Sequence, residues 1–195
     1  MGAIHAPFSL DRMERAVDKV RERLARATSI LEEAHIPYAV AGGNAVALWV
    51  TTVDEAAVRN TRVVDILIRR ADLEAVKLAL EAQGFVYRHT AGIDAFLDGP
   101  DSKVRDAVHV IFDGEMVRAH EALPNPGVAD YVESGGVRVL SLEALVQIKL
   151  TAFRDKDRTH LRDLLDVGLI DELWCAKYPP ELAARLKHLI DTPEG

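Results

Sequence analysis

The chain has 195 residues, of which 49% are hydrophobic, and it has no uninterrupted run of eighteen apolar residues. This length and composition indicate one globular domain, or one with an appended tail, and exclude a transmembrane helix. A net charge of −7 argues against electrostatic capture of long nucleic acid, and a single cysteine excludes an internal disulfide. The first residues lack an apolar segment behind a basic one, so we expect no secretory signal and a cytoplasmic protein.

The first predicted element is an amphipathic helix over residues 10–34, starting near Ser9 or Asp11. Its apolar stripe recurs at alternating steps of three and four and comprises Leu10, Met13, Val17, Val20, Leu24, Ala27 and Leu31. The same spacing fits a short coiled-coil seam, but a seam with Ala and Met positions is a weak zipper. We therefore expect a helix that braces a sheet and ends before Pro37.

A predicted strand, Tyr38 to Ala41, leads directly into Gly42-Gly43, and a helical segment starts at Asn44. Two glycines let the backbone turn tightly and bring its N–H groups close to a ligand at the start of a helix, where the dipole favours an anion. The alternative is a tight turn without a ligand.

After a charged loop, a strand over residues 62–68 is predicted from its β-branched residues and its period of two. Val63, Asp65 and Leu67 share one face of this strand. Asp65 is a lone carboxylate among apolar residues, and such a charge is costly unless it is paired or bound to a metal. The alternative is an aspartate bonded to a neighbouring loop.

The next elements alternate between helix and strand. They are a helix over 71–83 that stops at Gly84, a strand over 85–88, a short strand over 95–97 and a strand over 108–112. His109 shares a face of the last strand with Ile111 and Asp113. We consider it either a site residue or a satisfied core histidine.

Residues 118–136 are predicted to be a loop and a hinge, because proline and glycine breakers cluster there. A short strand over 137–140 and C-terminal helices follow. Lys149 and Arg154 alternate there with aspartates, which indicates either surface ion pairs or cations that point at phosphates. The expected divisions are a bracing helix (1–35), an α/β core (36–117), a hinge (118–136) and a strand with helices (137–195).

These residues carry a family resemblance. Gly42-Gly43 followed by the segment RNTRVVDIL, residues 59–67, resembles the signature of the nucleotidyltransferase superfamily, the polymerase-β-like fold. The segment from Ser141 to Asp166 is similar to the Lys- and Asp-bearing helices of AbiEii-like and minimal nucleotidyltransferases of toxin–antitoxin systems. The resemblance covers roughly residues 36 to 170 and implies an α/β (α+β) fold, with a mixed sheet flanked by helices and a C-terminal helical tail.

The resemblance also implies a chemistry, the transfer of a nucleoside monophosphate from an NTP to a hydroxyl of RNA, protein or a small molecule. Carboxylates would hold Mg²⁺ or Mn²⁺ against the triphosphate. The family pattern implies Asp65 as metal ligand and as a catalytic residue together with His109. It implies a nucleotide-binding set of Gly42, Gly43, Asn44, Arg59, Thr61, Lys149 and Arg154.

The sequence departs from that pattern at two positions. Val63 stands where the first Asp of Asp-x-Asp is expected, and His109 stands where the third carboxylate is expected. Three outcomes stay open. The chain is an enzyme that uses Asp65 with Asp113 or Asp163, or it holds a softer metal with Asp65 and His109, or it is a non-catalytic binding module, antitoxin-like or partner-binding.

Overall fold

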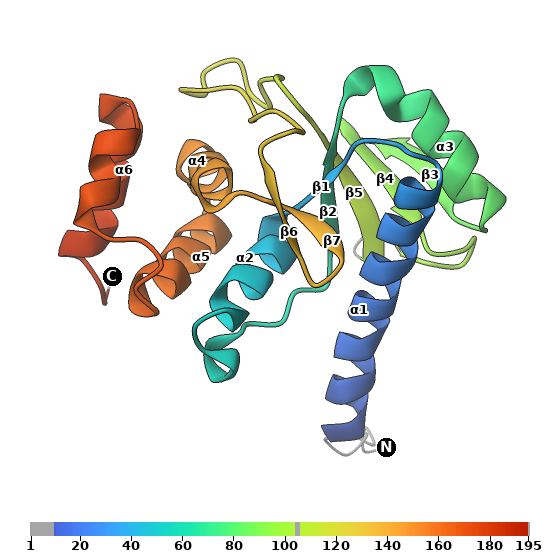
Figure 1. The fold of residues 1–195 in the computed structure, drawn as a ribbon, viewed down its shortest axis with the longest axis horizontal. Coiled ribbons are helices and arrows are strands. Elements are labelled where there is room, and N and C mark those ends of the chain that lie inside the picture. Colours follow the sequence, from blue (N-terminus) through green and yellow to red (C-terminus); the bar gives the residue numbers. More distant parts are fainter. Residues whose placement is uncertain (1–9, 104–105, 195) are drawn as a thin grey trace, which may run out of the picture.

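The structure is a computed structural model that describes residues 10–103 and 106–194. Its strands are β1 (Ala39–Ala41), β2 (Val64–Ile68), β3 (Val86–Thr90), β4 (Ile93–Leu97), β5 (Ala107–Phe112), β6 (Tyr131–Ser134) and β7 (Val137–Leu140). They form one mixed seven-stranded sheet in the order β3-β4-β5-β2-β1-β7-β6 (Figure 1). The predicted mixed sheet flanked by helices is confirmed.

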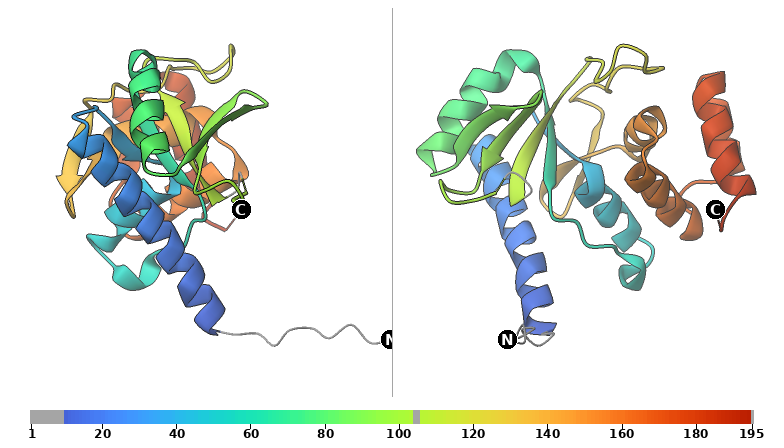
Figure 2. Two further views of the ribbon diagram at one scale, coloured as in Figure 1. Left: turned by 90° about the vertical axis from the view of Figure 1, so that its right-hand side faces the viewer. Right: turned by 180° about the vertical axis from the view of Figure 1, so that it is seen from behind.

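Helices cover both faces of this sheet (Figure 2). They are α1 (Leu10–Glu33), α2 (Gly42–Thr51), α3 (Leu73–Ala82), α4 (Leu142–Ala152), α5 (Asp155–Asp166) and α6 (Pro180–Asp191), with short 3-10 turns η1 (Glu55–Ala57), η2 (Arg70–Asp72) and η4 (Glu172–Lys177). Helices α1 and α3 lie on one face, and α2, α4 and α5 lie on the other, with α6 outermost.

Helix α1 is the brace that its apolar stripe predicts. It packs on α3, β2 and β5, and it buries Val20, Ala27 and Leu31. Burial of these side chains removes apolar area from water and so stabilises the helix against the sheet. The expected start near Ser9 and the expected lack of a secretory signal concern residues 1–9, which lie outside the described residues.

The strand register brings the predicted site residues together. β1 and β2 pair antiparallel with Ala41 opposite Asp65, and β2 and β5 pair parallel with Asp65 opposite His109. Partners in register project from the same face of a sheet. Asp65, His109 and the start of α2, which follows Ala41, are therefore neighbours, although about forty residues separate Asp65 from His109 in the chain.

The stretch predicted as loop and hinge, residues 118–136, contains a strand instead. Tyr131–Ser134 forms β6, which pairs antiparallel with β7, and Gly135 and Gly136 make the turn with positive φ values of 59° and 80°. The pairing of β7 with β1 continues the sheet across this stretch. The loop prediction was wrong for these four residues, and the proposed division of the chain at this point stays a prediction.

The remaining differences are small. The helix predicted from residue 71 begins as the 3-10 turn η2 before α3, and the short strand at 95–97 extends back to Ile93. Among the described residues, no helix is both long and apolar enough to cross a membrane.

Candidate functional site

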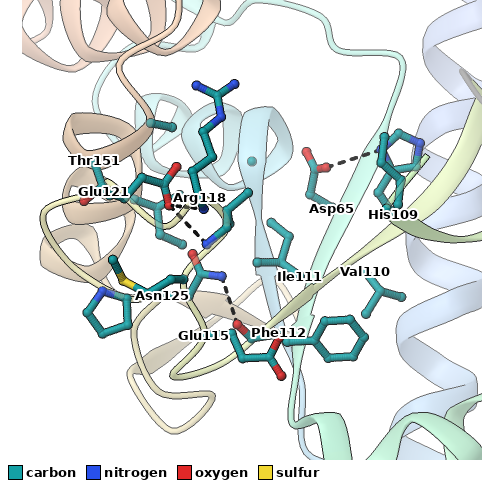
Figure 3. Close-up of a pocket in the computed structure, with 18 of the residues that line it drawn as sticks. Asp65, His109, Val110, Ile111, Phe112, Glu115, Arg118, Glu121, Asn125 and Thr151 are labelled. Atoms are coloured by element: carbon teal, nitrogen blue, oxygen red, sulfur yellow. Dashed lines mark hydrogen bonds and ion pairs between the residues drawn. The ribbon is translucent and has the colours of Figure 1, made fainter. Parts of the chain in front are cut away.

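A cavity of about 480 Å³ opens beside the start of α2. Five of the predicted site residues line it, and they come from four elements and the turn after α4: Gly42, Asp65, His109, Lys149 and Arg154. The segment after β5 forms the opposite wall, with Glu115, Arg118, Glu121 and Asn125 among the lining residues (Figure 3).

Gly42 is required by the position of Asp65. Its φ of +63° lies in the left-handed region, and a Cβ atom at this residue would stand 1.9 Å from Oδ2 of Asp65. Any side chain at position 42 would therefore collide with the carboxylate. The N-cap residue of α2, Ala41, makes no side-chain cap bond to the first N–H groups of the helix, and Gly42 at the helix start lines the cavity together with Asp65.

Asp65 and His109 face each other without a hydrogen bond. Oδ1 of Asp65 lies 3.9 Å from Nδ1 of His109, and each side chain is about one-fifth exposed. Figure 3 shows the two side chains at one end of the cavity. This distance permits an ion pair whenever the imidazole is protonated, and it leaves both groups accessible from the cavity.

Lys149 and Arg154 are held by one buried carboxylate, that of Asp157. Nζ of Lys149 lies 3.1 Å from Oδ1 of Asp157, and Nε of Arg154 lies 2.7 Å from Oδ2. Burial lowers the pKa of Lys149 below its ordinary value, although the carboxylates of Asp157 and Asp65 oppose this. Burial alone would raise the pKa of the Asp157 carboxyl, but Arg154 and Lys149 together hold it below its usual value.

Four predicted nucleotide-binding residues lie away from the cavity lining. Nδ2 of Asn44 donates to the carbonyl of Val63 at 2.7 Å, and Oγ1 of Thr61 donates to the same carbonyl at 3.4 Å. Arg59 pairs through Nε with Asp163 at 2.7 Å, and a Cβ on Gly43 would stand 3.0 Å from Thr61. These contacts fix the loop before β2 against α2 and α5, and a role in nucleotide binding stays a prediction for each residue.

His160 on α5 is a residue that the sequence reasoning did not single out. Its Cε1 atom lies 3.4 Å from the place of a Cβ on Gly43. Burial, and next the charge of Lys149, lowers the pKa of His160 to about 4, so the imidazole is neutral at pH 7. The signal in the sequence is its spacing of three residues from Asp157, which puts both side chains on one face of α5.

The residues near Asp65 do not fit a magnesium site. Magnesium prefers six oxygen ligands in octahedral geometry, whereas Asp65 faces the imidazole of His109, whose Nδ1 lies 3.9 Å from Oδ1 of Asp65. Among the described residues, no group of three His, Cys, Asp or Glu side chains is placed to hold a metal ion. The two acids considered as substitutes are engaged elsewhere, because Asp113 accepts the N–H of Val128 at 3.2 Å and Asp163 accepts from Arg59.

No family model and no curated protein matches this sequence. The structure is similar to that of an antigenic nucleotidyltransferase-like protein from Paracoccidioides brasiliensis, with a TM-score of 0.59, 18% identity and coverage of 91% of this chain and 89% of that one. It is also similar to a candidate nucleotidyltransferase from H. pylori, with a TM-score of 0.51, 16% identity and coverage of 93% and 79%.

These similarities establish the class of fold. The chain has a nucleotidyltransferase-like fold, as the glycine turn and the strand with Asp65 predict. At such low identity the likeness concerns the backbone, and the chemistry has to be argued from the site residues. The assignment to the AbiEii-like branch stays a prediction.

Proposed function

We propose that this protein binds a nucleoside triphosphate in the cavity beside Asp65 and does not depend on a carboxylate-held metal pair to do so. The observation that carries the proposal is the convergence on one cavity of Lys149, Arg154 and the start of α2 at Gly42. Cations and free helix N–H groups are the donors that bind phosphate oxygens.

The cavity suits a nucleotide in size and in lining. Its volume of about 480 Å³ falls within the range typical of small-molecule sites. Ile111, Met116 and Ile148 add apolar surface on which a base could pack. Glu121 orders the loop that carries Met116, because its Oε2 accepts the N–H groups of Val117 and Arg118 at 3.1 Å each.

The reduced set of carboxylates favours binding over transfer. The two-metal mechanism of nucleotidyl transfer needs several oxygen ligands, and Asp65 supplies the one carboxylate at the expected place. The protein would then be a catalytically inactive nucleotide-binding module, antitoxin-like or partner-binding.

Transfer is the second candidate function, and the geometry of Asp65 and His109 favours it. One of these two groups, a carboxylate and an imidazole 3.9 Å apart at a cavity wall, can accept the proton of an acceptor hydroxyl as its oxygen bonds to the α-phosphorus and pyrophosphate leaves. The acceptor would be a protein, an RNA or a small molecule. Incubation with an NTP labelled at the α-phosphate tests it, because transfer would place label on an acceptor and Asp65→Asn would abolish that label.

Equilibrium binding of ATP, GTP, CTP and UTP tests the main proposal. We expect wild type to bind at least one of them and Lys149→Met to bind it at least about tenfold more weakly, because a desolvated charge contact to phosphate is lost. Lys187→Met is the matched control, since Lys187 is an exposed lysine of α6 that pairs with Glu172 and Asp191. Failure of wild type to bind any triphosphate, or equal affinities of Lys149→Met and wild type, would contradict the proposal.

A further inference from the structure

Asp157 is the most enclosed charged side chain beside the cavity, with 0% of its surface exposed. Its two oxygens have different partners. Oδ1 accepts from Nζ of Lys149 at 3.1 Å, whereas Oδ2 accepts from Nε of Arg154 at 2.7 Å and from the Arg154 backbone N–H at 3.3 Å. One carboxylate therefore joins two of the cations that line the cavity.

This bridge spans a break between two helices. Helix α4 ends at Ala152, its capping residue Phe153 has a left-handed φ of 46°, and α5 begins at Asp155. Lys149 belongs to α4 and Asp157 to the first turn of α5, so their contact sets the relation of the two helices at the cavity. Without the Asp157 carboxylate, Arg154 in the turn would lose the acceptor of its Nε and of its backbone N–H.

The charges around Lys149 show why it needs Asp157. Lys149 is 3% exposed, and its ammonium is influenced by the carboxylates of Asp157 and Asp65 and by the cationic Lys156. His160 from α5 is neutral at pH 7. Asp157 is the carboxylate in hydrogen-bond contact with Lys149, and removal of one partner of a buried ion pair leaves the other charge without compensation.

We infer that Asp157 is a positioning residue for triphosphate binding, which keeps Lys149 charged and keeps both Lys149 and Arg154 directed at the phosphate groups. The inference rests on the proposed function, since it assigns the residue that positions the two phosphate-binding cations. Lys149, Arg154 and Asp157 together leave one net positive charge for the ligand.

The test compares ATP affinity of wild type, Asp157→Asn and Asp155→Asn. Asp155 is a matched control, because it lies in the same helical turn, loses the same charge, and is an exposed residue that pairs with Arg158. We expect Asp157→Asn to weaken binding at least about tenfold at pH 8, because the buried Lys149 ammonium loses its carboxylate partner, and Asp155→Asn to stay within about twofold of wild type. Relative to wild type, the affinity of Asp157→Asn should rise as the pH falls, because burial lowers the pKa of Lys149 and the loss of the Asp157 carboxylate lowers it further.

A role confined to the stability of the fold would not produce that pH profile. Equal affinity of Asp157→Asn and wild type, or a loss that does not recover on acidification while the protein stays folded, would overturn the inference. Wild type that binds no triphosphate would overturn the proposed function itself, and with it this inference.

A second pair of variants covers the case in which Asp157→Asn does not fold. Lys149→Met with Asp157→Asn removes both buried charges together, which proteins tolerate better than the loss of one. Relative to Lys149→Met, the double variant should bind ATP several-fold more weakly, because Arg154 loses its anchors. Lys149→Met combined with Asp155→Asn should bind like Lys149→Met, and equal affinities of the two double variants would refute the role of Asp157.

Discussion

The carboxylate of Asp65 occupies the place where a side chain at residue 42 would begin, since its Oδ2 lies 1.9 Å from the position of a Cβ on Gly42. The position of the Asp65 carboxylate therefore requires a glycine at residue 42. The backbone at Gly42 starts α2 in a conformation that leaves room for Asp65 and keeps its carboxylate beside the helix N-terminus.

Gly42→Ala should therefore be more destabilising than strain alone explains. The left-handed φ of +63° costs a non-glycine residue about 1–2 kcal/mol, and the collision with Asp65 should add about 1–3 kcal/mol. Urea unfolding of wild type and variant measures the difference in the free energy of unfolding.

Gly84→Ala is the control for this prediction. Gly84 also has a positive φ, +85°, but among the described residues no heavy atom lies within 4 Å of the place that its Cβ would take. It should show the cost of strain alone, about 1–2 kcal/mol. Equal costs at the two glycines would show that Asp65 does not restrict residue 42.

Val63→Asp should create a metal site that the wild-type chain does not offer. The new carboxylate would stand two residues before Asp65 and one residue before the start of β2, and strand alternation continued to residue 63 would put it on the face of Asp65, where two aspartates can share one ion. We expect calorimetry to show Mn²⁺ binding to Val63→Asp but not to wild type or to Val63→Asn, which has similar size without the charge. A folded Val63→Asp variant that does not bind Mn²⁺ would refute the view that the carboxylate missing at residue 63 is what prevents metal binding.

His160 should make the fold sensitive to mild acid. Its pKa of about 4 in the folded protein lies below the ordinary value of 6.5, so the unfolded chain takes up the proton first as the pH falls. Stability contributed by the neutral imidazole is complete above about pH 6.5 and is lost progressively toward pH 4, by up to about 3 kcal/mol.

The measurement for this prediction is urea unfolding of wild type and His160→Gln from pH 7.5 to about pH 4. Because carboxylates such as Asp157 titrate in both proteins, the difference between the two profiles isolates the histidine. Wild type should lose stability relative to His160→Gln across this window. Parallel profiles would mean that the histidine is charged or solvated in the folded protein.

Local patterns predicted much of the fold and the centre of the site. The period of two in the strand of Asp65, the glycine turn and the stripe of α1 each follow from short-range sequence, and the structure has all three elements. β6 went unrecognised because Tyr131–Ser134 is short, is bordered by breakers and is mostly exposed, so its residues show no alternation of burial.

Contacts that depend on tertiary geometry could not be predicted in the same way. Lys149 and Asp157 are eight residues apart, and the left-handed Phe153 lies between them. Because the helix is interrupted there, helical periodicity does not tell whether the two side chains lie on the same side. The pair of Arg59 and Asp163 likewise joins residues more than a hundred positions apart. The burial of these charged side chains and their contacts depend on how the helices and strands pack together. Local sequence patterns do not determine that packing.

The affinity of the wild-type protein for ATP, measured in a metal chelator and in excess Mg²⁺, shows whether the chain's own residues form the phosphate site. We predict that ATP binds in the chelator, with an affinity similar to that in Mg²⁺, because Lys149, Arg154 and the start of α2 supply the charge and the N–H donors. Binding that vanishes in the chelator and returns with Mg²⁺ would contradict a phosphate site built from the chain's own residues.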